Sequence, residues 1–269
     1  FHVRWLCTNE KFHNSYGGNK MAEKKPVQQA VPTEAETDAH VDDLVNKALK
    51  ALEEFEDFTQ EQVDYIVAKC SVAGLDHHGI LAEAAVNETG RGVFDVKNLF
   101  ACEYVTNNLR HLKTVGIINE DPLTGITEIA EPVGVVCGIV PTTNPTSTVI
   151  FKSLIALKTR NPIIFSFHPS AHESSKQAAI VIRDAAIAAG APENCIQWLS
   201  IKSMYATNAL MNHPGVATIL ATGGNAMVKA AYSCGKPALG VGAGNVPAYV
   251  EKTCVLPRAV NDIVLSKSF

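Results

Sequence analysis

Apolar residues recur every three or four positions along residues 39–73, a spacing that predicts amphipathic helices. The pattern breaks once and restarts at Thr59, which is followed three residues later by Gln62. A threonine and a glutamine at this distance are typical of a helix start. We therefore predict two helices in this stretch, and Thr37 and Asp38 offer caps for the first of them.

The helical spacing continues over 75–88 and 93–112. Two glycines in the intervening segment, 89–92, indicate a helix stop followed by a new start. Between 115 and 131 the pattern changes to short alternating runs on either side of a Pro- and Gly-containing turn at 121–125. This pattern predicts a β-hairpin.

From residue 133 onward, runs of β-branched residues alternate with helical segments. The predicted strands are 133–140, 163–167, 195–200 and 216–221, and the helices that follow them are 146–158, 173–189, 203–212 and 225–234. Four strand–helix units in series favour an α/β fold with a parallel, doubly wound sheet.

Composition narrows the class of protein. The chain has 269 residues, of which 46% are hydrophobic and 19% charged, with a formal net charge of −4. These values exclude a disordered chain, a disulfide-rich mini-protein and a basic nucleic-acid-binding protein. Residues 132–250 nevertheless carry eight Lys and Arg side chains against three acidic ones, a mild positive charge that suits a small anionic ligand such as a dinucleotide.

The seven cysteines are widely spaced and include no Cys-x-x-Cys pair. We therefore expect reduced thiols and a cytoplasmic protein. The uncharged run 132–151 contains three prolines, so we interpret it as a buried strand with its loop and expect no membrane partner. Residues 1–35 lack a periodic pattern, and we interpret them as a non-native or disordered lead.

Three turns are candidate binding sites, and two of them follow predicted strands. Thr142, Thr143 and Asn144 lie in a Pro-bounded turn after the first strand, two glycines stand in 222–225 after the fourth, and three stand in 240–245. Ligands of such sheets bind at the carboxyl ends of the strands, and glycines let a phosphate approach the backbone. Each motif alone is more often only an ordinary turn. Together the three favour a nucleotide, bound in a variant mode because neither Gly-x-Gly-x-x-Gly nor a P-loop is present.

Other polar clusters favour structural roles. His168 and His172 are separated by a proline, and neither they nor the pair His77-His78 has a Cys or acid at metal-ligand spacing. We interpret these histidines as surface or capping residues and expect no metal site. The cysteines lack a partner base in the sequence, so we interpret them as buried or surface thiols without a catalytic role.

Five stretches closely resemble the aldehyde dehydrogenase half of the bifunctional aldehyde-alcohol dehydrogenases. They are Gly138–Ser147, Phe151–Asn161, Leu220–Gly224, Met227–Tyr232 and Gly240–Asn245. The resemblance extends from about Glu36 to Phe269, over what we take to be the NAD-binding part of that domain. It implies an aldehyde-dehydrogenase-like fold with a helical N-terminal segment, a Rossmann-type parallel sheet and the 115–131 hairpin as an oligomerisation arm.

The resemblance also implies an activity and partners. A CoA-acylating acetaldehyde dehydrogenase interconverts acetyl-CoA and NADH with acetaldehyde, CoA and NAD. In such enzymes the full chain adds an iron-dependent alcohol dehydrogenase and forms homo-oligomers or filaments. The resemblance implies NAD as the cofactor. His168 stands where the family usually carries a lysine, so the preference for NAD over NADP follows from the resemblance alone.

Site residues follow from the matching positions. The resemblance assigns cofactor binding to Ile139, Val140, Pro141, Thr142, Thr143, Asn144, Gly224 and Gly242. Asn144 also takes the place of the asparagine whose side-chain amide stabilises the oxyanion in aldehyde dehydrogenases. One such preorganised donor contributes about 3–4 kcal/mol.

Two departures from the family pattern affect the chemistry. Gly240 and its neighbours replace the Glu-Leu-Gly-Gly-Lys of hydrolytic members, so the carboxylate that activates water is missing and a thiol such as CoA becomes the acyl acceptor. The nucleophilic cysteine of the family follows the segment that here ends at Phe269, and Cys254 does not match it. We therefore expect residues 1–269 to bind cofactor without catalysing the reaction. The alternatives are a stand-alone acylating or semialdehyde dehydrogenase, or a non-catalytic assembly fragment.

Overall fold

The computed structural model describes residues 32–92, 101–103, 105–244 and 246–268. Its helices are α1 (Glu34–Phe55), α2 (Gln60–Asp76), α3 (His78–Thr89), α5 (Pro145–Lys158), α6 (His172–Ala188), α7 (Met204–Asn212), α8 (Asn225–Ser233) and α9 (Leu256–Lys267), with a π-helix η1 (Val105–Leu109) and a 3-10 turn η2 (Pro169–Ala171). Its strands are β1 (Gly116–Asp121), β2 (Ile126–Ala130), β3 (Val135–Val140), β4 (Ile163–Phe167), β5 (Ile196–Trp198), β6 (Val216–Thr222) and β7 (Ala238–Val241).

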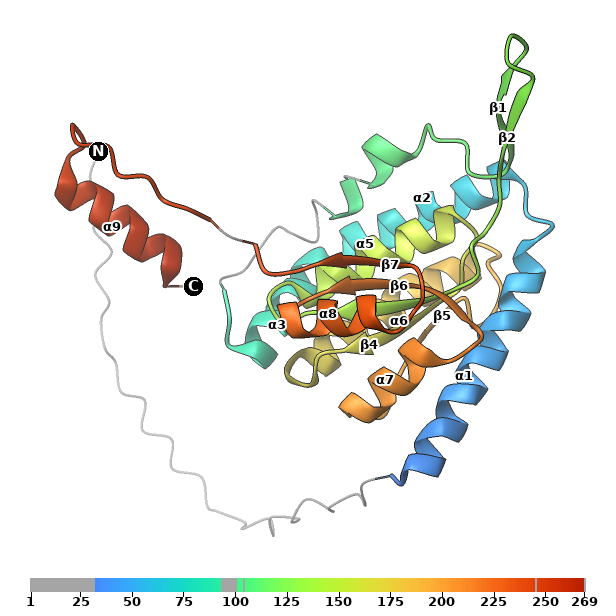
Figure 1. Cartoon of the computed structure of the whole chain (residues 1–269), viewed down its shortest axis with the longest axis horizontal. Coiled ribbons are helices and arrows are strands. Elements are labelled where there is room, and N and C mark those ends of the chain that lie inside the picture. Colours follow the sequence, from blue (N-terminus) through green and yellow to red (C-terminus); the bar gives the residue numbers. More distant parts are fainter. Residues whose placement is uncertain (1–31, 93–100, 104, 245, 269) are drawn as a thin grey trace, which may run out of the picture. The chain divides into compact units, whose positions relative to one another are not determined.

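Five parallel strands form the central sheet, in the order β5-β4-β3-β6-β7 (Figure 1). All six residues of β3 are buried, as expected for the middle strand of a covered parallel sheet. Gly138 lies opposite Phe165 of β4, and a Cβ at this position would come within 2.8 Å of the phenylalanine ring. Close packing between the two strands therefore requires the glycine. The α/β fold with a parallel sheet is confirmed.

Helices cover both faces of this sheet (Figure 1). On one face α5 and α6 pack against β3 and β4, and α2 packs outside them in the same apolar cluster. On the other face α1 and α7 pack against the sheet around Val45, Leu210 and Ile219. The amide Nε2 of Gln197 in β5 donates to the carbonyl oxygen of Leu44 in α1 at 3.0 Å, which anchors the N-terminal helix to the sheet.

The first helix begins earlier than we expect from the sequence. Thr33 is its N-cap, and Thr33 and Glu36 exchange the two hydrogen bonds of a capping box. Thr37 lies inside the helix, where its hydroxyl donates back to the carbonyl oxygen of Thr33 at 2.9 Å. The prediction of a start at Thr37 or Asp38 is therefore wrong, because the reciprocal pair at Thr33 satisfies more backbone groups. The second start is confirmed, with Thr59 and Gln62 forming another capping box.

The hairpin is confirmed as the antiparallel pair β1 and β2. The Asp121 carboxylate accepts hydrogen bonds from the backbone of Leu123 at 2.9 Å and from the hydroxyl of Thr124 at 2.7 Å, which stabilise the turn. Much of the helix predicted over 93–112 lies outside the described residues. The described part of it ends in a π-helix rather than a regular α-helix.

Two elements near the C-terminus differ from the sequence prediction. Residues 240–245 are predicted as a candidate binding turn, but Gly240 and Val241 belong to β7, which pairs with β6. Helix α9 is not predicted at all, and no side chain of it is buried. Among the described helices, none is both long and apolar enough to cross a membrane.

Candidate functional site

The first two predicted binding turns lie at the same edge of the sheet. They follow β3 and β6, which are parallel neighbours with Ile139 opposite Ala221 (Figure 1). The connections of the chain also reverse direction here, since β4 and β5 lie on one side of β3 while β6 and β7 lie on the other. Ligands of open α/β sheets bind at such a reversal point. The fold therefore brings the two turns together where a ligand is expected.

Asn144 presents a side-chain amide at this edge. It is the N-cap residue of α5, and its carbonyl oxygen accepts from the hydroxyl of Thr148 at 2.7 Å. Its side-chain oxygen Oδ1 accepts from the hydroxyl of Thr143 at 3.0 Å, which fixes the orientation of the amide. No described residue accepts a hydrogen bond from its Nδ2. Two N–H donors thus remain for a ligand or for a developing oxyanion.

The turn after β6 leaves space beside its backbone. Gly223 has a φ of 158°, within the region that favours glycine. Gly224 is the N-cap of α8, and a Cβ at either position would meet no atom within 4 Å. Packing therefore does not explain these two glycines. The first N–H groups of α8 have no intrahelical partner and no side-chain cap in the described chain, an arrangement that suits an anion such as a phosphate.

Gly242 has a different environment. A Cβ on it would lie 2.6 Å from Oδ1 of Asn225, the first residue of α8. The same oxygen accepts a hydrogen bond of 3.2 Å from the backbone N–H of Ala243. Gly240 is similarly confined by Val228 and Tyr232 of α8. Gly240 and Gly242 thus lie where this segment closely approaches α8, which also brings Gly242 next to the turn at Gly224.

The predicted residues Ile139 and Val140 have buried side chains, so only their backbone could contact a cofactor. The carbonyl oxygen of Ile139 accepts from Nζ of Lys152 at 2.6 Å and from the hydroxyl of Thr222 at 3.0 Å. Lys152 also donates to the carbonyl oxygen of Leu220 at 2.6 Å, and its burial lowers its pKa to about 7. Sequence reasoning missed this lysine, although a lysine in the middle of the apolar residues of α5 is a signal.

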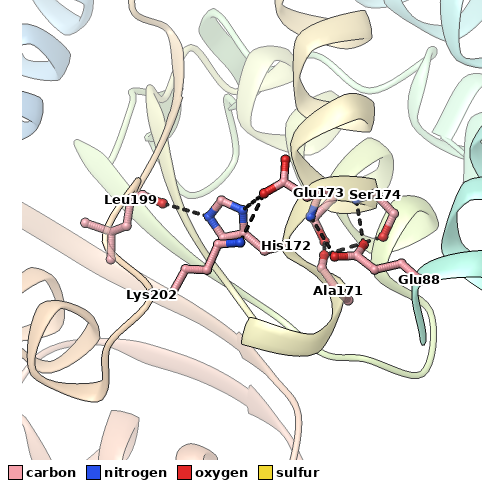
Figure 2. A network of polar contacts seen from close by, with 8 residues as sticks. Glu88, Ala171, His172, Glu173, Ser174, Leu199 and Lys202 are labelled. Atoms are coloured by element: carbon pink, nitrogen blue, oxygen red, sulfur yellow. Dashed lines mark hydrogen bonds and ion pairs between the residues drawn. The ribbon is translucent and has the colours of Figure 1, made fainter. Parts of the chain in front are cut away.

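A second polar network lies at the carboxyl end of β4, around the start of α6 (Figure 2). The Glu88 carboxylate, from α3, accepts from the backbone N–H groups of Glu173 at 2.9 Å and Ser174 at 2.7 Å. His172 contacts Oε1 of Glu173 at 3.1 Å, and Lys202 contacts the same oxygen at 3.0 Å. The helix start is therefore already capped by a carboxylate from the protein itself.

The histidines of this segment are partly as predicted. His168 is exposed and caps η2, where its Nδ1 accepts from the backbone of Ser170 at 3.2 Å. His172 is buried and its side chain does not cap α6, so its prediction as a surface or capping residue is wrong. Its Nε2 donates to the carbonyl oxygen of Leu199 at 3.3 Å, which compensates the burial of the ring. Within the described residues, no group of three or more His, Cys, Asp or Glu side chains could bind a metal ion.

The buried cysteines have the environment of structural thiols. Burial raises the pKa of Cys102, Cys137 and Cys195 to about 12, and it raises the pKa of Cys70 as well. A cysteine acts as a nucleophile in its thiolate form, which these surroundings disfavour. The six described cysteines are all free thiols.

Comparison with known proteins identifies the family. The model of the aldehyde dehydrogenase family matches residues 13–269. The chain belongs to this family. It is 71% identical over 254 residues to the aldehyde-alcohol dehydrogenase of Streptococcus pneumoniae, a match that covers 93% of this chain and 28% of that protein. It is 69% identical over 237 residues to aldehyde-alcohol dehydrogenase 2 of Entamoeba histolytica, which covers 86% of this chain and 27% of the relative.

A solved structure supports the fold of this aldehyde dehydrogenase chain. The acetylating aldehyde dehydrogenase of Geobacillus thermoglucosidasius superposes with a TM-score of 0.81 at 47% sequence identity, over 88% of this chain and 53% of that one. The chain thus spans about half the length of this structure and between a quarter and a third of the curated relatives. The resemblance stated from the sequence motifs is confirmed.

Proposed function

We propose that this chain is the NAD(H)-binding portion of a CoA-acylating acetaldehyde dehydrogenase. The reaction converts acetyl-CoA, NADH and a proton into acetaldehyde, CoA and NAD, or the reverse, in fermentative ethanol metabolism. One observation supports the proposal. In this member of the aldehyde dehydrogenase family, the Asn144 amide and the open turn at Gly224 lie at the same edge of the sheet, where β3 and β6 end. Its similarity to aldehyde-alcohol dehydrogenases supports the substrate class.

The residues present fit a dinucleotide. The open space beside Gly224 and the uncapped N-terminus of α8 suit the pyrophosphate, and the 141–144 turn and Gly242 border the same edge. These residues would hold the cofactor. When bound, NAD accepts the hydride that the substrate carbon loses.

Asn144 would act in the step at the substrate carbonyl. In the acylating reaction a cysteine thiolate forms a bond to the aldehyde carbon, and the carbonyl oxygen becomes an alkoxide. Nδ2 of Asn144 would donate a hydrogen bond to that oxygen and stabilise it. We assign this nucleophile to none of the six described cysteines. Because β7 and the residues after it carry glycines where hydrolytic members have a glutamate, the thioester would be cleaved by the CoA thiol rather than by water.

The hairpin suits contact between copies of the chain. Ile117, Ile126 and Ile129 expose more than half of their surface, and Leu123 in the turn is 97% exposed. Exposed apolar side chains on a two-stranded ribbon favour burial against another protein surface. We propose that β1 and β2 form the arm of a homo-oligomer. The free cysteines also suit the reducing cytoplasm, where we place the enzyme.

Titration of the purified 269-residue chain with NADH tests the proposal. We expect saturable binding, and a Gly224→Val variant that binds about tenfold more weakly. Its unfolding midpoint should fall only slightly, because a Cβ at Gly224 meets no atom within 4 Å and the expected loss is that of an N-cap glycine. We expect no NADH production from acetaldehyde, CoA and NAD. Equal NADH affinity of the two proteins would contradict the assigned site, and turnover by residues 1–269 would contradict the assignment as a cofactor-binding portion.

A further inference from the structure

Lys152 is a cation inside the molecule, directly behind the candidate site. Its side chain rises from α5, is 3% exposed, and ends between β3 and β6. Nζ donates to the carbonyl oxygens of Ile139 and Leu220 and to the hydroxyl oxygen of Thr222, at 2.6, 2.6 and 3.1 Å. One side chain therefore holds the carboxyl ends of both strands that carry the predicted cofactor turns.

The geometry favours the charged form of this amine. The Thr222 hydroxyl directs its own proton to Ile139, so its oxygen can only accept from Lys152. Three acceptors then need three N–H donors, and only an ammonium has three. No carboxylate in the described chain pairs with Lys152 to balance this charge. An unbalanced buried cation is costly, unless an anion binds close by.

We infer that Lys152 is a positioning residue for the dinucleotide, holding the ends of β3 and β6 together with an ammonium whose charge is balanced by the phosphates of NAD(H). This inference rests on the function proposed above. Lys152 itself donates only to protein oxygens, so it acts through Thr222 and the Gly223-Gly224 turn that follows, and through the buried charge. Charges interact strongly across a protein interior because little water screens them.

The inference predicts that cofactor binding and protonation are linked. Without cofactor, burial lowers the pKa of Lys152 to about 7, so the amine is partly neutral near pH 7.5. Cys137 of β3 is the titratable group that affects it, and this thiol stays protonated because burial raises its pKa to about 12. The contacts from β6 are an uncharged carbonyl and a hydroxyl. A bound dianion favours the ammonium, so NADH should bind with proton uptake and more weakly as the pH rises.

The pH dependence separates this role from a purely structural one. The pKa of Lys152 is lower in the folded chain than in the unfolded chain. Between these two pKa values the unfolded chain therefore binds more protons than the folded one. The cofactor-free protein should thus become more stable as the pH rises above 7. NADH affinity should change in the opposite direction. If Lys152 only joined the two strands, NADH affinity would not fall over the pH range in which the stability of the free protein rises.

NADH titrations of the 269-residue chain between pH 6.5 and 8.5 test the inference. We expect affinity to fall about tenfold over this range. Lys152→Met should bind weakly at both ends of the range without this dependence. Thr222→Val keeps the charge and should retain it. If Lys152→Met does not fold, titration calorimetry of the unaltered chain at pH 7.5, in buffers of different ionisation enthalpy, should show uptake of about half a proton or more per NADH.

The possible results distinguish the two proposals. Saturable binding that does not depend on pH and takes up no proton would overturn the role of Lys152 and leave the NAD(H) site standing. A pH dependence retained in Lys152→Met would assign the titration to another group and also overturn it. Absence of saturable binding at every pH would overturn the proposed function, and the inference with it.

Discussion

The hydroxyl of Thr222 donates a hydrogen bond of 3.0 Å to the carbonyl oxygen of Ile139, and so joins the carboxyl ends of β6 and β3. Thr218, on the same strand, makes a similar bond of 2.9 Å to the carbonyl oxygen of Pro237. That second bond lies at the amino end of the sheet. Comparing Thr222 with Thr218 therefore separates two effects of such a hydrogen bond: its contribution to the stability of the fold and its contribution to NADH binding.

We expect Thr222→Val and Thr218→Val each to lower the free energy of unfolding by about 1 kcal/mol, the usual contribution of one hydrogen bond. Only Thr222→Val should also weaken NADH binding, by about threefold, because only that threonine lies beside the Gly224 turn. Urea unfolding and NADH titration of both variants make the comparison. Equal effects of the two variants on NADH affinity would argue against a site at the ends of β3 and β6.

Asn144 should affect the chemical step more than cofactor binding. In an active acylating enzyme that carries this chain, Asn144→Ala should lower kcat about 100-fold with little change in NADH affinity, because it removes the oxyanion donor. Thr143→Val should cost only a few-fold, since it removes the bond that orients the amide and keeps the donor itself. Steady-state kinetics with acetaldehyde and CoA measure both. A loss of NADH affinity that accounts for the whole effect of Asn144→Ala would refute its role at the oxyanion.

Glu88 should make stability depend on pH. Partial burial raises the pKa of this carboxyl, but hydrogen bonds from Ser174 and from the backbone of Glu173 outweigh that effect and leave the pKa below its usual value. The ionised cap therefore stabilises the fold above the pKa of an unfolded glutamate, and this contribution is lost as the pH falls through the lower folded value. Because Glu88 is exposed and water screens these bonds, we expect Glu88→Gln to cost about 0.5 kcal/mol at pH 7.

Unfolding measured from pH 7 to pH 3 checks this prediction. The difference between Glu88→Gln and the unaltered chain should shrink toward the acidic end. Glu83→Gln is the matched control, because Glu83 is an exposed glutamate on the same helix. A penalty for Glu88→Gln that stays constant down to pH 3 would show that the carboxylate charge does not matter.

The hairpin should determine the assembly state. We expect Ile129→Lys to dissociate the proposed oligomer, because the proposed contact would have to bury the lysine charge in place of an isoleucine. Ile187→Lys makes the same change at an exposed isoleucine of α6, outside the hairpin, and should leave the assembly unchanged. Light scattering coupled to size-exclusion chromatography reports the mass of each. An unchanged mass for Ile129→Lys would place the contact elsewhere.

The central sheet could be predicted from the sequence because its strands are short runs of β-branched residues separated by helical spacing. Ile163–Phe167 is a clear example, since its bounds agree with β4. Strand β7 could not be predicted in this way. It has four residues, and Gly240 within it is required by contact with α8, so the glycine reflects packing rather than a loop.

The candidate site was partly predictable for a related reason. Turn residues such as Asn144 and Gly224 follow strands in the sequence, and the carboxyl ends of parallel strands lie at one edge. The apolar sequence of α5 indicates that Lys152 is buried, but the sequence does not show which atoms its amine contacts. Only the fold shows that its Nζ reaches β3 and β6. The start of α1 was missed because Thr33 competes with Thr37 and Asp38 as a cap.

Equilibrium titration of the purified 269-residue chain with NADH, followed by nicotinamide fluorescence at pH 6.5, tests the central claim most directly. The claim is that the turns after β3 and β6 form a dinucleotide site. It predicts a saturable change in fluorescence that fits a single class of site and is reversed by excess NAD. A response that rises in proportion to NADH without saturation, or that excess NAD does not displace, would contradict it.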